Sequence, residues 1–294
     1  MKTRYKQSGR TLAEMAVVIA VIVLLGSIGL PAIRAFLDSF ESGTGARPVI
    51  SAALASARAI AAKEQKYAGI RFQKAYNPDF PLDPLKADQY MVFIINDPNI
   101  GAHYFRAVEG LEPMKLPDGL GVMDLAILIS RNVRNPVNPG IGNEVFLNDP
   151  ALTPIDKDGW LNEPRELTDT TTFSIIFSPS GKLVMHGVRV TNRDGTTEAT
   201  ETPILSMDDT FNTLIKISNP VAPIGMFIQD DYFGASYPDY GLGPEPSRRA
   251  FVIYDRREFK SAYDKGRAYS DYLSKLIPDE VIQINPYTGT MVEK

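Results

Sequence analysis

The chain has 294 residues, 44% of them apolar, which is enough for one large domain or two small ones with a packed core. Its formal net charge of −4 argues against a surface built mainly from clustered Lys and Arg to hold nucleic-acid backbones. It has no cysteine, which excludes thiol catalysis, cysteine-based zinc sites and iron–sulfur clusters.

The first predicted element is a membrane-spanning helix at about residues 15–33, where the sequence is free of charge. About 19 helical residues at ~1.5 Å each are just enough to cross a hydrocarbon core of ~30 Å. The basic residues that precede the run place the N-terminus in the cytoplasm; they are Lys2, Arg4 and Lys6. Everything after Arg34 is therefore expected to be exported.

Three interpretations of this segment compete. A secretory signal peptide needs a small-residue cleavage site, and the candidates at Ala32 and Ala35 are poor beside Pro31 and Ile33. A plain signal anchor explains the apolar run but leaves Glu14 without a role. An ionised carboxylate costs about 2.5–3.5 kcal/mol at the centre of a membrane helix and less near the interface, so Glu14 calls for a partner.

Residues 8–22, SGRTLAEMAVVIAVI, resemble the processing site of the type IV prepilin family, which is the third interpretation. The resemblance implies cleavage by prepilin peptidase between Gly9 and Arg10, with Glu14 as the fifth mature residue. In the family this Glu pairs with the N-terminal amine of a neighbouring subunit, so that two charges that are costly in lipid neutralise each other on assembly. Pro31 falls at mature position 22, where pilin helices carry a helix-loosening proline.

One position departs from the family pattern. Arg10 stands where the family usually has Phe at the first mature position, which puts cleavage efficiency and N-methylation in question. Removing the leader, residues 1–9, would take away three basic side chains and no acidic ones. The exported part would then carry a net charge of −7.

A helix break is predicted at about residues 41–48, because Gly43, Gly45 and Pro48 are poor interior helix residues. Pro48 suits the first turn of a new helix that runs to about residue 64. Apolar residues recur along that helix at three- and four-residue spacing: Ile50, Ala53, Leu54, Ala57, Ile60 and Ala61. Residues 10–64 are therefore expected to form the N-terminal pilin helix as one long, interrupted spine.

Residues 65–190 are expected to form a β-sheet domain. Short apolar or alternating runs lie between Gly, Pro, Asn and Asp here and further along, at 68–72, 90–95, 102–108, 145–147, 172–177, 182–190, 214–217, 226–228 and 251–254. Ser178-Pro-Ser-Gly181 is typical of a hairpin turn. The predicted fold class is α+β, with a long, partly transmembrane N-terminal helix packed on a β-rich globular domain.

These segments resemble the GspH/FimT group of minor pseudopilins and minor pilins. The resemblance rests on Ser-Ala-Arg at 56–58, the strand 67–72, KLPDGLGV at 115–122 and FSIIFSPSG at 173–181. It implies a pilin-like fold in which an Ala-Arg-bearing helix packs on two sheets, with an LP-x-G loop midway and an F-x-P-x-G hairpin near the end. It covers roughly residues 10–190, with long insertions.

Residues 191–294 fall outside that pattern and are expected to be a C-terminal extension. Residues 191–203 and 230–249 are predicted to be surface loops. One helix is predicted at about residues 256–276, capped by Asp255 with Glu258 three residues on. The tail, residues 281–292, is predicted to be strand and turn.

Candidate sites for chemistry are few. His103 and His186 are the two histidines, and without a G-x-S-x-G elbow we interpret them as surface or sheet residues rather than as catalytic ones. Asp156 and Asp158, followed by Gly159, resemble half of a calcium loop, although Pro154 occupies the first ligand position. Asp230-Asp231 near Asp239 is a weaker calcium candidate.

Two further clusters are open to functional and structural interpretations. An aromatic loop could contact a partner subunit, or it could cover an edge of the core; it holds Tyr232, Phe233, Tyr237 and Tyr240. The densest basic clusters are too small to predict DNA binding; they are Arg248-Arg249 and Arg256-Arg257.

We therefore expect a structural subunit, a minor pseudopilin of a type II secretion pseudopilus or a related type IV filament. The alternative is a FimT-like minor pilin that binds DNA or a surface. A membrane-tethered enzyme has no supporting constellation, and no cofactor other than calcium is suggested. The expected partners are other pilin or pseudopilin subunits, prepilin peptidase, the inner-membrane assembly platform and lipid. The expected location is the bacterial inner membrane, with a single pass and a periplasmic C-terminal domain, and then an extracytoplasmic filament.

Overall fold

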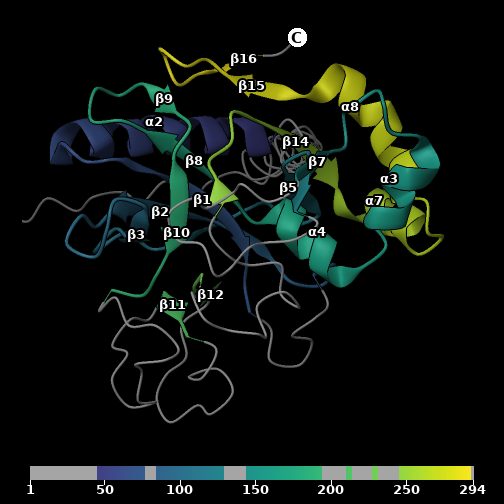
Figure 1. Ribbon diagram of the computed structural model, residues 1–294, viewed down its shortest axis with the longest axis horizontal. Helices are drawn as coiled ribbons and strands as arrows, with labels where there is room; N and C mark the ends of the chain where they lie inside the picture. The colour runs from purple at the N-terminus through teal and green to yellow at the C-terminus, as the bar shows by residue number, and fades with distance from the viewer. Residues whose placement is uncertain are drawn as a thin grey trace, which may run out of the picture.

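The computed structural model describes residues 45–76, 84–128, 144–193, 210–213, 227–230 and 245–292. The protein is a mixed α+β structure in which helix α2 (Ala46–Glu64) packs across a curled sheet, with further small sheets beside it (Figure 1). This agrees with the predicted fold class at that level. Within the described residues no helix is both long and apolar enough to cross a membrane, and the helix predicted at residues 15–33 lies outside them.

Helix α2 forms where the apolar spacing predicts it. Pro48 lies in its first turn, where the missing N–H removes no helical hydrogen bond. The helix ends at Gln65, whose left-handed φ of 53° lets its N–H bond the carbonyl of Ala61. The buried stripe faces the sheet and consists of Ala46, Ile50, Ala53, Leu54, Ala57 and Ala61.

The large sheet has the strand order β13-β10-β3-β2-β1-β8-β9, with β4 paired to β2. All its pairs are antiparallel except β10 with β3, which makes the sheet mixed. Its strands are β1 (Ala68–Lys74), β2 (Gln89–Asn96), β3 (Tyr104–Ala107), β4 (Met114–Lys115), β8 (Phe173–Phe177), β9 (Leu183–Val184), β10 (Gly187–Val190) and β13 (Glu245–Pro246).

The described residues also form three smaller sheets. A four-stranded sheet has the order β16-β15-β14-β5, built from β5 (Leu120–Met123), β14 (Ala250–Asp255), β15 (Ile282–Ile284) and β16 (Met291–Val292). The two-stranded sheets pair β6 (Ala126–Leu128) with β7 (Glu144–Phe146), and β11 (Phe211–Asn212) with β12 (Phe227–Ile228).

Within the described ranges, five further helical segments gather at one end of the molecule (Figure 1). They are α3 (Pro154–Trp160), α4 (Pro164–Thr171), α7 (Arg256–Tyr263), the π-helix η1 (Ala268–Leu273) and α8 (Ser274–Glu280). The prediction of one helix at residues 256–276 was wrong. Asp255 caps α7 as predicted, but Gly266 takes a left-handed φ of 65° and ends the first helical segment.

Segments from both sides of residue 190 share one hydrophobic cluster. Ile50 and Leu54 of α2, Phe72 of β1, Phe251 of β14 and Ile282 of β15 are all buried in it. The predicted tail is confirmed as strand and turn, because β15 and β16 pair around the turn at residues 285–289. The C-terminal strands therefore share a hydrophobic core with the helix.

Candidate functional site

The residues predicted to be processed or to direct assembly are Gly9, Arg10, Glu14 and Pro31, and all four lie outside the described residues. The described part of the predicted spine is α2. Its buried side packs on the sheet, and its opposite side is exposed and carries small side chains. These are Ala52, Ala55, Ser56, Ala59 and Ala62.

Arg58 of α2 joins the helix to two turns that are distant in sequence. Its Nε donates to the carbonyl of Gly181 at 2.8 Å, in the turn between β8 and β9. Its Nη1 donates to the carbonyl of Thr288 at 2.8 Å and its Nη2 to that of Tyr287 at 3.2 Å, in the turn between β15 and β16. One guanidinium thus holds the helix, the hairpin and the C-terminal turn together.

Glycine is required on both turns that Arg58 contacts. Gly181 and Gly289 have φ values of 74° and 70°, which are strained for residues with a side chain. A Cβ on Gly181 would lie 3.0 Å from the Nε of Arg58, and one on Gly289 would lie 2.9 Å from a ring carbon of Phe177. The hairpin predicted at Ser178–Gly181 is confirmed, and its glycine leaves room for the arginine.

Replacing Arg58 with alanine is expected to lower the free energy of unfolding by about 1–3 kcal/mol, because three charge-assisted hydrogen bonds are lost. Arg58→Lys should recover little of it, since an ammonium lacks the planar fork that reaches three carbonyls. Denaturant unfolding of the purified chain measures this loss. Lys63→Ala, at an exposed position on the same helix, is the matched control and should stay within about 0.5 kcal/mol of the parent.

The predicted LP-x-G loop is partly strand. Lys115 ends β4, and the short turn before β5 leads into pairing with β14. Gly121 of β5 lies under the ring of Tyr254, where a Cβ would be 2.5 Å from the tyrosine hydroxyl oxygen. Lys115 forms ion pairs with Asp118 at 2.8 Å and Asp88 at 2.9 Å. The segment therefore joins the large sheet to the four-stranded one.

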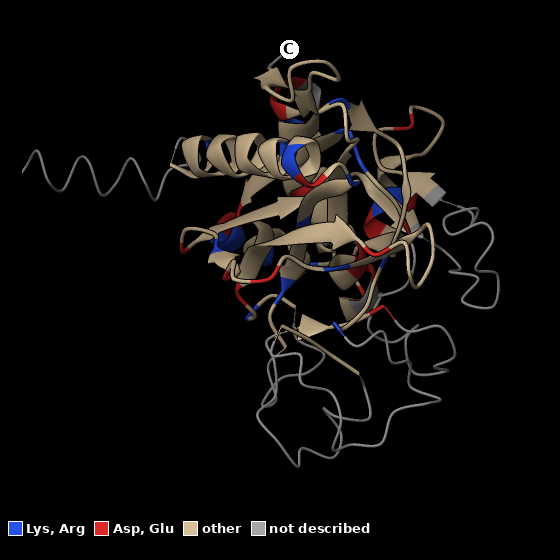
Figure 2. Ribbon diagram, turned by 90° about the vertical axis from the view of Figure 1, so that its left-hand side faces the viewer, with Lys and Arg blue, Asp and Glu red and all other residues tan. Residues whose placement is uncertain are grey.

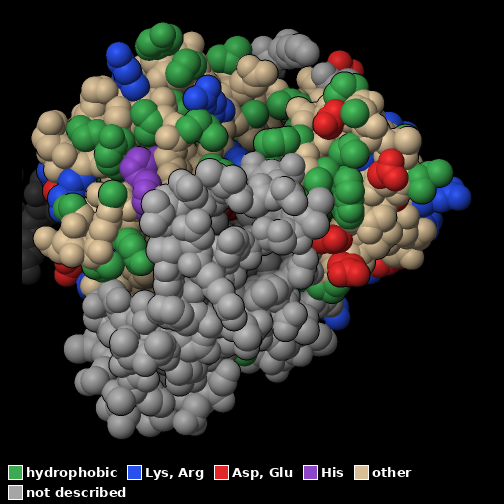
Figure 3. Space-filling model, viewed as in Figure 1, with side chains coloured by type: hydrophobic (Ala, Val, Ile, Leu, Met, Phe, Trp, Pro, Cys, Tyr) green, Lys and Arg blue, Asp and Glu red, His purple; other side chains and the backbone are tan. Residues whose placement is uncertain are grey.

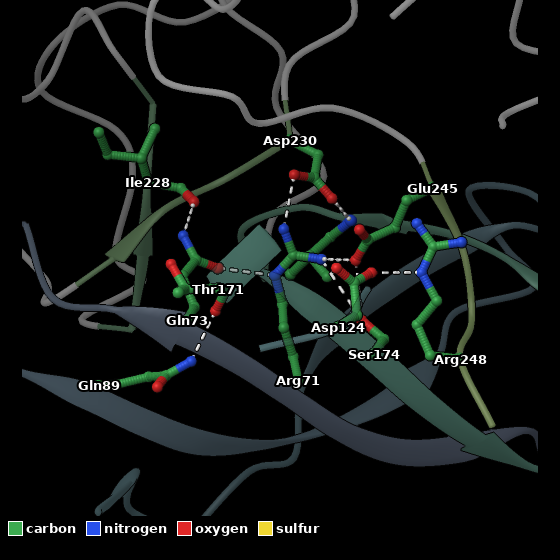
Figure 4. A network of polar contacts seen from close by, with 11 residues as sticks. Arg71, Gln73, Gln89, Asp124, Thr171, Ser174, Ile228, Asp230, Glu245 and Arg248 are labelled. Atoms are coloured by element: carbon green, nitrogen blue, oxygen red, sulfur yellow. Dashed lines mark hydrogen bonds and ion pairs between the residues drawn. The ribbon is translucent and has the colours of Figure 1, made fainter. Parts of the chain in front are cut away.

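A buried charged network lies on the sheet face away from α2 (Figure 4). Arg71 of β1 has no exposed side-chain surface, and it forms ion pairs with Asp230 at 2.8 Å and Glu245 at 3.2 Å. It also donates to the side-chain oxygen of Gln73 at 2.6 Å, and Gln73 in turn donates to the carbonyl of Ile228 at 2.8 Å. The network ties two segments from beyond residue 226 to strand β1.

A second buried ion pair joins Asp124, which follows β5, to Arg248, which precedes β14, at 2.5 Å. Burial raises the pKa of Asp124 to about 7, with Asp169 adding to the rise and Arg248 opposing it. Arg248 also donates its backbone N–H to the carbonyl of Ser174 in β8. These buried charges connect strands from different parts of the chain, so their role is structural.

The calcium hypothesis placed Asp156 and Asp158 in a loop, and the structure has helix α3 there instead. Asp156 forms a capping box with Thr153, and the hydrogen bonds from Thr153 lower the pKa of its carboxyl group. Asp158 accepts the N–H groups of Tyr269 and Ser270 at 2.7 and 3.0 Å and so caps the start of η1. Within the described ranges no three His, Asp or Glu side chains are grouped to hold a metal ion.

Of the other candidate residues, some have a structural role and the rest lie outside the described residues. Asp230, the weaker calcium candidate, is the buried partner of Arg71. Asp231, Asp239 and the aromatic loop residues Tyr232, Phe233, Tyr237 and Tyr240 lie outside the described ranges. His103, just before β3, and His186, just before β10, lie with ring centroids 5.3 Å apart.

Each basic cluster has one arginine that is buried or partly buried and one that is exposed. Arg248 is bound to Asp124, and Arg256 is bound to Asp88 at 3.2 Å and to the carbonyls of Leu85 and Ala87. Their neighbours Arg249 and Arg257 are exposed. Acidic and basic positions are interspersed over the described elements in Figure 2.

The fold and site define an α+β protein whose first described helix is clamped onto a curled mixed sheet by Arg58. No family model, curated protein or solved structure matches the chain.

Proposed function

We propose that this protein is a structural subunit, a minor pseudopilin, of a type II secretion pseudopilus or a related type IV filament. The observation that carries the proposal is the spacing of Gly9, Glu14 and Pro31 ahead of a helix, α2, that packs on a sheet. In this proposal prepilin peptidase cuts after Gly9, and the released N-terminal helix assembles beside those of other subunits.

The geometry around α2 supports this role. A subunit held in a filament by its N-terminal helix must transmit load from that helix to its globular part. Helix α2 buries one full stripe against the sheet, and Arg58 adds three hydrogen bonds to two turns. The helix and the hairpin at Gly181, which both contribute to the GspH/FimT resemblance, meet at this guanidinium. A pilin-like fold with a C-terminal extension is the finer description that we propose.

The proposed location and partners follow from the N-terminal segment. The chain would span the inner membrane once, with a cytoplasmic N-terminus and a periplasmic domain, before it enters an extracytoplasmic filament. Its partners would be other pilin or pseudopilin subunits, prepilin peptidase, the assembly platform and lipid. No cofactor or catalytic step is part of the proposal.

The Glu14→Ala variant tests the assembly mechanism. It is expected to insert into the membrane normally but to lose most of its incorporation into filaments, because the amine of the neighbouring subunit no longer meets a carboxylate in lipid. The measurement compares the amounts of protein in membranes and in sheared filaments from cells that assemble them. Thr11→Ala, in the same segment, is the control and should incorporate like the parent. Normal incorporation of Glu14→Ala would contradict the pairing mechanism.

No second function is proposed for the basic residues. Arg248 and Arg256, half of the two clusters, form ion pairs with carboxylates, so those clusters present fewer charges to a phosphate backbone than their sequence indicates.

A further inference from the structure

The two histidines of the chain, distant in sequence, become neighbours on the sheet. His103 precedes β3 and His186 precedes β10, and these strands pair in parallel, with the N–H of Arg189 bonded to the carbonyl of His103. Both side chains are partly exposed, and the histidines form a single patch on the face seen in Figure 3. Hydrophobic side chains lie close to that patch in the same view.

Hydrogen bonding fixes the tautomer of His186. Its Nδ1 lies 2.7 Å from the carbonyl oxygen of Gly187, which can only accept, so Nδ1 carries the proton. The lone pair is therefore on Nε2. A histidine that donates one N–H to a backbone carbonyl and offers the other nitrogen has the arrangement that metal-binding histidines adopt.

His103 has a buried nitrogen whose hydrogen-bonding capacity is unused. Its Nδ1 is inaccessible to solvent and has no hydrogen-bond partner among the described residues. A buried polar atom left without a partner costs about 1–3 kcal/mol, so such an atom calls for an explanation. Coordination to a metal ion, by this nitrogen or after rotation of the ring, would provide one.

We propose that His103 and His186 form a two-imidazole site for a late first-row divalent ion, Zn²⁺ or Cu²⁺, completed by water. The ring spacing fits. Nitrogen–metal distances of about 2.0–2.1 Å in a tetrahedral site place two imidazole centroids roughly 5 Å apart, and here they lie 5.3 Å apart. Tyr67 and Phe105 flank His186, at 4.5 and 5.5 Å between centroids, and limit its movement.

The surroundings select the kind of ion. Imidazole nitrogen suits Zn²⁺ and Cu²⁺, whereas Ca²⁺ and Mg²⁺ need several oxygen ligands. No carboxylate joins the two histidines to make a three-residue group within the described ranges.

The direct test is pulsed EPR on the full-length, tag-free protein with one equivalent of Cu²⁺. The chain has two histidines in all, so an imidazole signal has no other source. The expected result is modulation from the remote nitrogens of two imidazoles, unchanged on dilution of the protein. A spectrum with one imidazole or none would overturn the proposal.

Calorimetry with Zn²⁺ gives an independent readout. His103→Gln and His186→Gln are each expected to weaken binding about tenfold or more, and Mg²⁺ should give no binding isotherm. Melting temperatures in EDTA show whether each variant is folded, and the EPR result on the parent protein stands if one is not. Unchanged Zn²⁺ affinity in the double variant would also overturn the proposal.

Discussion

Replacing Arg71 with methionine is expected to lower the free energy of unfolding by about 3–5 kcal/mol. The guanidinium is fully buried between Asp230 and Glu245, whose side chains are 0% and 1% exposed. Methionine fills much of the same volume but removes the cation that lies between two buried carboxylates. Breaking one side of a buried ion pair costs far more than the pair contributes, because desolvated charge is left uncompensated.

Urea unfolding of the purified full-length protein measures this loss. Lys260→Met is the matched control, because Lys260 and Asp264 form an exposed pair, with side chains 49% and 55% accessible. This variant should lose less than about 1 kcal/mol of its free energy of unfolding. Adding Asp230→Asn to Arg71→Met should restore part of the loss by removing one stranded charge. A loss below 1 kcal/mol for Arg71→Met alone would show that the buried network does not stabilise the sheet.

Gly69→Ala is expected to lower the free energy of unfolding by about 3 kcal/mol or more, at least as much as the truncation of a large core side chain. Gly69 lies in β1 opposite Ile176 of β8, and a Cβ there would overlap the backbone carbonyl of Ile175. It would also lie 2.7 Å from the Cδ1 of Ile176. Backbone atoms of a central strand pair cannot move aside without separating the strands, so the overlap is not relieved locally.

Gly159→Ala is the control for this substitution. Gly159 lies inside helix α3, and a Cβ there would meet nothing within 4 Å. Alanine favours helix over glycine by about 0.5–1 kcal/mol, so this variant should match or exceed the parent in stability. If thermal melting placed both alanine variants at the parent value, the close pairing of β1 with β8 would be wrong.

Local patterns in the sequence predicted a substantial part of the fold. The stripe in α2, the alternation in β1 and the apolar run of β8 each predict their own element, because each pattern is local in the sequence. The Ser178–Gly181 hairpin and the Asp255 cap were also predicted, because their hydrogen bonds are local. Helix α3 was missed, although Thr153, Pro154 and Asp156 are typical of a capped start.

Contacts between residues that are distant in the sequence were not predicted. The alternation of Arg71 with Ile70 and Phe72 indicates a strand, but it does not show that residues 227–230 and 245–248 bury the guanidinium. Likewise, nothing in the spacing of Arg58 indicates that it reaches residues 287 and 288, and the two histidines meet only because β10 pairs with β3. Such contacts depend on the path of the whole chain, which a periodic pattern does not encode.

Mass spectrometry of the N-terminus, on protein extracted from membranes that contain prepilin peptidase, determines whether the chain is processed as a prepilin. We expect a chain that begins at Arg10, with residues 1–9 removed, and the uncut chain in cells that lack the peptidase. An intact leader in peptidase-containing membranes, or a cut at another position, would contradict this expectation.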